Sequence, residues 1–169
     1  MISSNAPVGI KYDAGVSAQL KSAVILAGLN AYGLTKINEE EKSRDHTENM
    51  LRQNSKVIKI KKGKKKIIKV FGRKKLKAIN IQVPGDPSSA AFFTALTLLN
   101  KKSNLKIKNV GLNNTRIGFY DLLKKQGAKI RFINIKKKNN ELIGDILIKS
   151  CKLKPINASS KYYVKTTDE

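Results

Sequence analysis

The stretch GVSAQLKSAVILAGL, residues Gly15 to Leu29, determines the fold because it begins a plan that the chain follows twice. The first copy runs from Gly15 to Lys59, and the second, about 71 to 72 residues later, runs from Gly85 to Arg131. Each copy contains a Ser-rich start, a long apolar helix, a short strand, an Arg, a second amphipathic helix and a further strand. Internal self-similarity at a fixed period indicates repeated supersecondary units, none of which buries its apolar face alone.

In the first copy, helical spacing of apolar residues predicts two helices, over residues 17–30 and 45–51. Period-two alternation predicts three strands, over residues 34–38, 57–61 and 65–71, the last two forming a hairpin. Ser17 is the expected N-cap of the first helix. Asp45 opens the second helix, and Glu48 follows at the spacing of a capping box.

The second copy gives the same kind of pattern after an extended segment that ends in Pro84-Gly-Asp-Pro87. It predicts helices over residues 88–99 and 116–126 and strands over residues 105–110, 130–135 and 142–149. We expect Ser88 to cap the first of these helices, which is so apolar that every side of it should be covered. Residues after 154 form no complete element, as if a third unit were beginning.

Length and composition favour an ordinary soluble protein. The 169 residues are 40% hydrophobic, enough for a core in one or two domains. The longest apolar runs are much shorter than the ~20 residues that a membrane span requires, and no signal peptide opens the chain, so we expect a cytoplasmic protein. Cys151, the lone cysteine, has no partner for an intramolecular disulfide and is interpreted as a structural strand residue.

The formal net charge of +23 raises the possibility of a polyanion partner. Of the 35 basic residues, however, 30 are Lys, whereas bidentate recognition of phosphate or guanine favours Arg. The longest Lys runs, 61–66 and 136–138, fall between strand patterns and resemble hairpin tips. We therefore expect solvated turns rather than a nucleic acid-binding surface, and keep a Lys-rich RNA or polyanion-binding module as the alternative.

Two positions could hold an anion. A Ser-rich helix start gathers free amide donors and partial positive charge, and Ser17-Ala18-Gln19 adds an amide side chain that can both donate and accept. Ordinary N-capping explains the same serine. Arg44, before the second helix, could hold a phosphate or form a local ion pair with Asp45. We expect no metal or cofactor, because no cluster of metal-ligating residues and no glycine-rich phosphate loop is present.

Four strings in the same order and spacing resemble the EPSP synthase family, the 3-phosphoshikimate 1-carboxyvinyltransferases. They are Gly15 to Leu29, SRDHTENML from Ser43 to Leu51, VPGDPSSAAFF from Val83 to Phe93, and NTRIG from Asn114 to Gly118. The resemblance implies an α/β (α+β) fold of repeated βαβαββ units in two lobes, with helices inside and sheets outside. It covers nearly all of the chain but only the middle ~40% of a typical member, so the chain is expected to be an internal fragment.

The same resemblance implies a division and a reaction. Residues 1–80 would be the last unit of one lobe, 81–155 the first unit of the other, and 156–169 the start of a truncated third unit. The family transfers the enolpyruvyl group of phosphoenolpyruvate to the 5-hydroxyl of shikimate 3-phosphate, through a tetrahedral adduct that loses phosphate.

Individual site residues follow from the matched strings. Ser17, Ala18 and Gln19 match the motif that holds shikimate 3-phosphate, and Arg44 matches a further position for that substrate. Asp168 resembles the family's Asp that is proposed as the proton acceptor. The chain lacks the family's other Lys and Arg positions, so we expect it to be inactive alone, and the full-length protein to be a monomer. The sister transferase that acts on UDP-N-acetylglucosamine is the nearest alternative enzyme.

Overall fold

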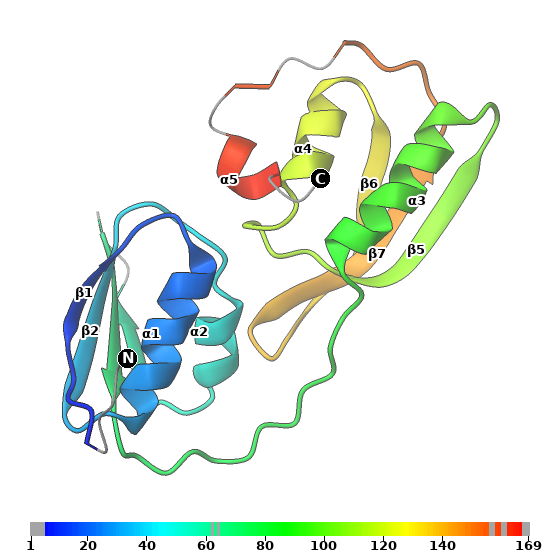
Figure 1. Ribbon diagram of the computed structural model, residues 1–169. Helices are drawn as coiled ribbons and strands as arrows, with labels where there is room; N and C mark the ends of the chain where they lie inside the picture. Colours follow the sequence, from blue (N-terminus) through cyan, green and yellow to red (C-terminus); the bar gives the residue numbers. More distant parts are fainter. Residues whose placement is uncertain (1–5, 62, 64, 156–157, 160–161, 167–169) are drawn as a thin grey trace. The chain divides into compact units, whose positions relative to one another are not determined.

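The computed structural model describes residues 6–61, 63, 65–155, 158–159 and 162–166. The chain separates into two compact units, Met1–Asn80 and Ile81–Glu169 (Figure 1). No helix in the described part of the chain is long and apolar enough to cross a membrane.

The first unit has the element order βαβαββ. Its elements are β1 (Lys11–Ala14), α1 (Ala18–Asn30), β2 (Leu34–Glu39), α2 (His46–Leu51), β3 (Ile58–Lys61) and β4 (Lys66–Phe71). The four strands form one sheet in the order β1-β2-β4-β3, in which only β1 and β2 are parallel. The helix between two parallel strands is the usual crossover connection. The sequence pattern identified every element of this unit except β1.

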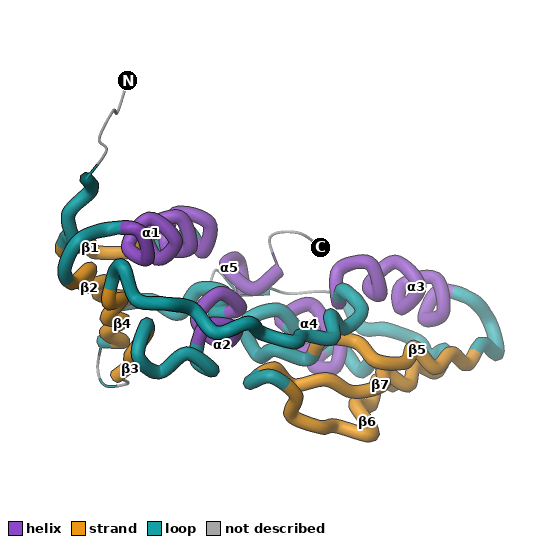
Figure 2. Tube along the Cα trace, turned by 90° about the horizontal axis from the view of Figure 1, so that it is seen from below, coloured by secondary structure: helices purple, strands orange, loops and turns teal. Residues whose placement is uncertain are grey.

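The core of the first unit lies between α1 and the sheet. Ile25 of α1 is fully buried with Ile37 of β2 and Ile68 of β4. In Figure 2, α1 lies along one face of the sheet. The predicted N-cap is confirmed, because the Ser17 side chain accepts a hydrogen bond from the Leu20 amide at 3.3 Å. The first turn of α1 therefore begins at a fixed point above the sheet.

The second unit has the same strand order with the first strand reduced to a single bridge. Its elements are α3 (Pro87–Leu99), β5 (Asn104–Gly111), α4 (Gly118–Lys125), β6 (Lys129–Lys138), β7 (Glu141–Lys149) and the one-turn helix α5 (Tyr163–Thr166). The sheet order is β5-β7-β6, all antiparallel, which matches β2-β4-β3 of the first unit. A parallel bridge from Gly85 to Val110 takes the place of the β1–β2 pairing.

The core of the second unit is centred on Tyr120 of α4, which is fully buried. Its hydroxyl donates a hydrogen bond to the Pro87 carbonyl at 2.6 Å, so α4 is attached to the first turn of α3. Both outer strands bulge against β7, where Asp145 accepts hydrogen bonds from the Asn109 amide at 3.1 Å and the Asn134 side chain at 2.8 Å. Both asparagines have positive φ, which Asn tolerates better than most residues.

Two predicted helix caps are wrong. Helix α3 is capped by Asp86 rather than Ser88, and Pro87 occupies its first turn, where the missing amide proton costs nothing. Helix α2 does follow Asp45, but the Asp45 side chain makes no capping hydrogen bond. Glu48, which was expected to complete a capping box, is instead turned inward and is 1% exposed.

Three further expectations also need correction. Helix α3 is not covered on every side, since Phe92 and Leu99 are 78% and 79% exposed. The Lys run 136–138 belongs to β6, and the turn after it is formed by Asn139 and Asn140, both with positive φ. Cys151 lies beyond β7 rather than in a strand, although it packs against the core as a structural residue should.

Candidate functional site

The start of α1 is the candidate anion site. Ser17 and Ala18 are half-buried and Gln19 is exposed. The first turn of α1, all of it described, contains no acidic residue, so nothing in it neutralises the partial positive charge of the helix start. The Ser17 hydroxyl also lies 3.4 Å from Gln19 Oε1, a long hydrogen bond that orients the amide side chain beside the cap. Ser17 is thus both an N-cap and part of the candidate site.

The corresponding start of α3 is already occupied by protein groups. Asp86 accepts hydrogen bonds from the Ser89 amide at 2.8 Å and from Arg116 at 2.9 Å, and Arg116 also donates to Ser88 Oγ at 2.7 Å. Partial burial raises the pKa of Asp86, but the hydrogen bonds from Ser89 and Arg116 outweigh it and lower the pKa below the usual 3.8. A carboxylate therefore takes the place that an anionic ligand would need.

Arg44 lies in the segment between β2 and α2, and contacts on its two sides connect this region to β2 and to α1. Ser43, immediately before Arg44, is 2% exposed and donates from its amide and its hydroxyl to Glu39 Oε1, at 3.1 and 2.8 Å. The Ser22 and Thr47 hydroxyls form a hydrogen bond of 2.8 Å between α1 and α2. The backbone on both sides of Arg44 is therefore held in place.

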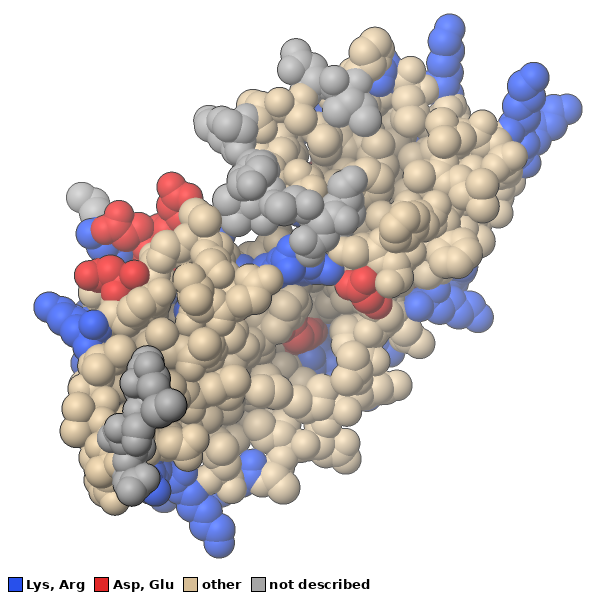
Figure 3. All heavy atoms as spheres, in the orientation of Figure 1, with Lys and Arg blue, Asp and Glu red and all other residues tan. Residues whose placement is uncertain are grey.

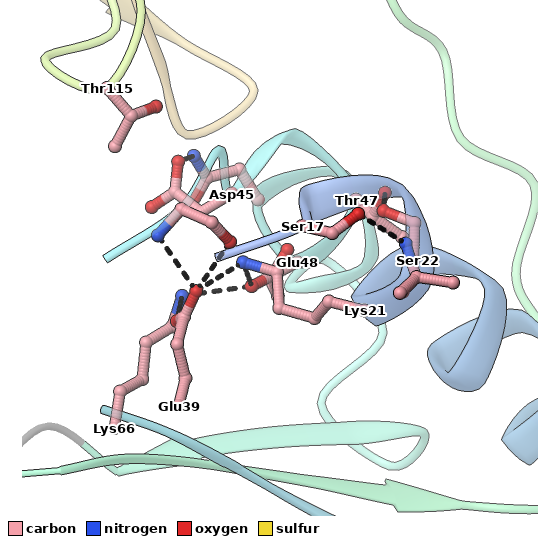
Figure 4. Close-up of polar contacts among 12 residues, drawn as sticks. Ser17, Lys21, Ser22, Glu39, Asp45, Thr47, Glu48, Lys66 and Thr115 are labelled. Carbon is pink, nitrogen blue, oxygen red and sulfur yellow. Dashed lines mark hydrogen bonds and ion pairs between the residues drawn. The ribbon is translucent and has the colours of Figure 1, made fainter. Parts of the chain in front are cut away.

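A closed ring of four charged side chains lies beneath these segments (Figure 4). Lys21 Nζ is 2.7 Å from Glu39 Oε1 and 2.9 Å from Glu48 Oε1. Lys66 Nζ completes the ring at 2.8 Å from Glu39 Oε2 and 2.9 Å from Glu48 Oε1. The side chains of Lys21, Glu39 and Glu48 are at most 1% exposed, and that of Lys66 is 14% exposed. Two cations and two anions give a neutral ring, the arrangement that buried charges require.

The contacts within the ring favour the charged forms of Glu39 and Lys66. Burial raises the pKa of Glu39, but hydrogen bonds from Lys21, Lys66 and Ser43 outweigh burial and lower it from 4.5 to about 2. Burial lowers the pKa of Lys66, whereas its contacts with Glu39 and Glu48 have the larger combined effect and raise it. Groups with such pKa values do not exchange protons near neutral pH, so the ring is suited to holding the structure rather than to acid–base catalysis.

Sequence reasoning located the helix start but missed the ring. Lys66 was interpreted as part of a hairpin tip, which is wrong, because it is the first residue of β4. The available signal was Lys21, which lies one turn after Ser17 and is the only charged residue of α1. Asp168, the candidate proton acceptor, lies outside the described residues. Among the described residues, no group of three His, Cys, Asp or Glu side chains is placed to hold a metal ion.

On the visible face of each unit, basic residues do not form a continuous patch. Figure 3 shows the Lys and Arg side chains of that face in separate groups with uncharged surface between them. Dispersed lysines attract polyanions without specificity. This distribution gives no support to a dedicated nucleic acid-binding surface on that face.

Comparison with known proteins identifies the family. The family model described as EPSP synthase (3-phosphoshikimate 1-carboxyvinyltransferase) matches residues 2–162. The 3-phosphoshikimate 1-carboxyvinyltransferase of Bacillus pumilus (strain SAFR-032) is 43% identical over 162 residues, 95% of this chain and 37% of that protein. That of Persephonella marina (strain DSM 14350 / EX-H1) is 46% identical over 138 residues, 82% of this chain and 32% of that protein.

A solved structure gives the same result for the fold. EPSP synthase from Acinetobacter baumannii superimposes with a TM-score of 0.81 at 41% identity, covering 96% of this chain and 37% of that one. The predicted fold class is confirmed by this match. The chain spans about a third of the length of the curated relatives that it matches. Sequence and fold together establish that the chain belongs to the EPSP synthase (3-phosphoshikimate 1-carboxyvinyltransferase) family.

Proposed function

We propose that this chain forms part of an enzyme that transfers the enolpyruvyl group of phosphoenolpyruvate to the 5-hydroxyl of shikimate 3-phosphate, releasing phosphate. The observation that carries the proposal is the start of α1, where Ser17, Ala18 and Gln19 form a helix N-terminus without an acidic residue in its first turn. Backbone amides and the helix dipole favour an anionic group there. The relatives of this chain are named for the same activity.

Each site residue has a role in this proposal. Ser17, Ala18 and Gln19 bind shikimate 3-phosphate, with Gln19 also near phosphoenolpyruvate, and Arg44 contributes its fixed positive charge to the phosphorylated substrate. Asp168 accepts the proton of the attacking hydroxyl as its oxygen bonds to the central carbon of phosphoenolpyruvate. The methylene carbon takes up a proton from a general acid and becomes a methyl group. The tetrahedral adduct then loses phosphate together with a proton of that methyl group, which restores the carbon–carbon double bond. The remaining cations that stabilise this charge come from outside the chain, so the chain alone does not turn over.

We also propose how this chain is placed within the complete protein. Residues 1–80 form the last unit of one lobe, residues 81–155 the first unit of the next, and residues 156–169 the beginning of a third. The complete protein acts as a cytoplasmic monomer on two small anionic substrates, without a cofactor.

Two experiments test the function. In the first, the isotopically labelled chain is titrated with shikimate 3-phosphate, and the amide resonances of residues 17–19 are expected to move. Gln19→Ala and Arg44→Met should weaken binding about tenfold each, the effect expected of removing a hydrogen bond to a charged group. A parent chain whose 17–19 resonances stay fixed at millimolar ligand would refute the assignment of the α1 start.

The second experiment tests the chemistry in a hybrid protein. The matching segment of the Bacillus pumilus relative is replaced by this chain, and phosphate release from the two substrates is measured. Activity is expected, with a loss of several orders of magnitude for Asp168→Asn, because a general base contributes about 10²–10⁴-fold. A folded hybrid in which Asp168→Asn retains full activity would disprove the role of Asp168.

A further inference from the structure

The two carboxylates of the buried ring differ in the contacts that they make outside the ring. Glu39 Oε1 accepts three hydrogen bonds, from Lys21 Nζ at 2.7 Å, from the Ser43 amide at 3.1 Å and from the Ser43 hydroxyl at 2.8 Å. Glu48 uses one oxygen for both lysines. Its other oxygen, like Glu39 Oε2, has no hydrogen-bond partner among the described residues, although Glu39 Oε2 lies 2.8 Å from Lys66 Nζ. Glu39 therefore connects the ring to the segment that carries Arg44, whereas Glu48 completes the charge balance.

We propose that Glu39 is a positioning residue, which holds the Ser43–Arg44 segment in register with the start of α1 so that Arg44 and Ser17–Gln19 bind one anionic substrate together. This inference rests on the proposed function. The mechanical connection is continuous: Lys21 lies one turn along α1 from Ser17, and its amide donates to the Ser17 carbonyl at 3.2 Å. Through Lys21 and Glu39, the α1 start is linked by buried polar contacts to Ser43.

Burying four charged side chains costs desolvation free energy, and a positioning role explains why the ring lies between α1 and the Ser43–Arg44 segment. Apolar residues of similar volume are often as stabilising as a buried ion pair, so stability alone does not require four charges here. Hydrogen bonds between charged groups are directional and strong, and they fix the relative position of two segments more tightly than apolar contact does. A binding group needs such support, because small displacements of it cause large losses of affinity.

Two double variants of equal composition separate positioning from stability. Lys21→Met/Glu39→Met leaves Lys66 paired with Glu48, and Lys21→Met/Glu48→Met leaves Lys66 paired with Glu39. Each loses one Lys and one Glu, each retains one neutral pair, and only the second keeps the carboxylate that binds Ser43. Both are made in the full 169-residue chain, and amide exchange and shikimate 3-phosphate binding are followed by NMR.

We expect the Ser43 amide to exchange at least about tenfold faster in the Glu39 variant than in the Glu48 variant, and affinity for shikimate 3-phosphate to fall about tenfold more, since a charged hydrogen bond is typically worth one factor of ten or more. Lys21→Met/Glu39→Gln, which restores an oxygen acceptor for Ser43, should recover part of both effects. Equal Ser43 exchange in the two Met variants would overturn the proposal. If the parent binds no shikimate 3-phosphate, the proposed function fails, while the exchange comparison still decides whether Glu39 fixes this segment.

Discussion

Lys21→Met should destabilise the first unit more than any ordinary surface substitution. The Lys21 ammonium is 0% exposed and lies 2.7 and 2.9 Å from two carboxylates that are themselves 1% exposed. Its removal leaves Glu39 and Glu48 facing the single cation of Lys66, a net negative charge inside the unit. Removing one partner of a buried ion pair costs about 3–5 kcal/mol. Since a domain is stable by only about 5–15 kcal/mol, this is at least about a fifth of the total.

Urea unfolding followed by NMR measures the effect on each unit separately. Amide resonances of the first unit should disappear at a much lower urea concentration in Lys21→Met, while those of the second unit serve as an internal reference. Lys69→Met is the control, because Lys69 is an exposed residue of β4 and its loss should change the free energy of unfolding by less than about 0.5 kcal/mol. Lys21→Met/Glu48→Met restores neutrality and should regain at least half of the loss. Equal midpoints for Lys21→Met and Lys69→Met would show that the ring carries no such energy.

Three further changes have defined outcomes. Gly72→Ala would place a Cβ atom 1.8 Å from the Ala31 carbonyl oxygen, so the first unit should lose at least about 1–3 kcal/mol in urea unfolding. Asp86→Ala removes the cap of α3 and should cost the second unit about 1 kcal/mol by the same measurement. The hydrogen bond from Asn134 is the main cause that lowers the pKa of Asp145 from 3.8 to about 2. Between these two pH values Asp145 is charged in the folded state and protonated in the unfolded state. The stabilisation by Asp145 should therefore be complete above pH 3.8 and disappear as the pH falls through about 2. In Asp145→Asn, the free energy of unfolding should lack this pH-dependent loss.

Most of the fold could be predicted from the sequence, because apolar residues that recur at helical or strand spacing mark the buried face of an element. Alternation over residues 57–61 and 65–71 predicted the β3–β4 hairpin, and the structure confirms it with β4 paired to both β2 and β3. Strand β1 was missed because Asp13 and Ala14 are poor strand formers, whereas β3, which is equally short, contains two β-branched Ile residues. Its pairing with β2 arises only when α1 returns the chain alongside it, which is a tertiary effect that no local pattern contains.

The polar part of the site is less accessible to sequence reasoning. Ser17 and Gln19 could be predicted as candidate site residues because helix starts have a local signature. The ring was not, because Lys21, Glu39 and Glu48 come from α1, β2 and α2, and each has an ordinary surface interpretation when considered alone. Only the packing of these elements shows that their charges compensate one another, and compensation is what permits their burial.

The two units share one order of elements, but their first long helices start with caps of different charge. In the second unit the cap is Asp86, whose carboxylate attracts Arg116 from the segment before α4. In the first unit the cap is Ser17, which satisfies an amide without adding charge. The segment with Arg44 is then fixed indirectly, through Ser43 and Glu39. A neutral cap and a first turn without acidic residues add no negative charge to the start of α1. A buried ring replaces the direct ion pair as the connection between the two segments. In the first unit the ring connects the two segments without an anion at the helix cap, so the start of α1 can accept an anionic ligand. For this reason we propose that substrate binds to the first unit rather than to the second.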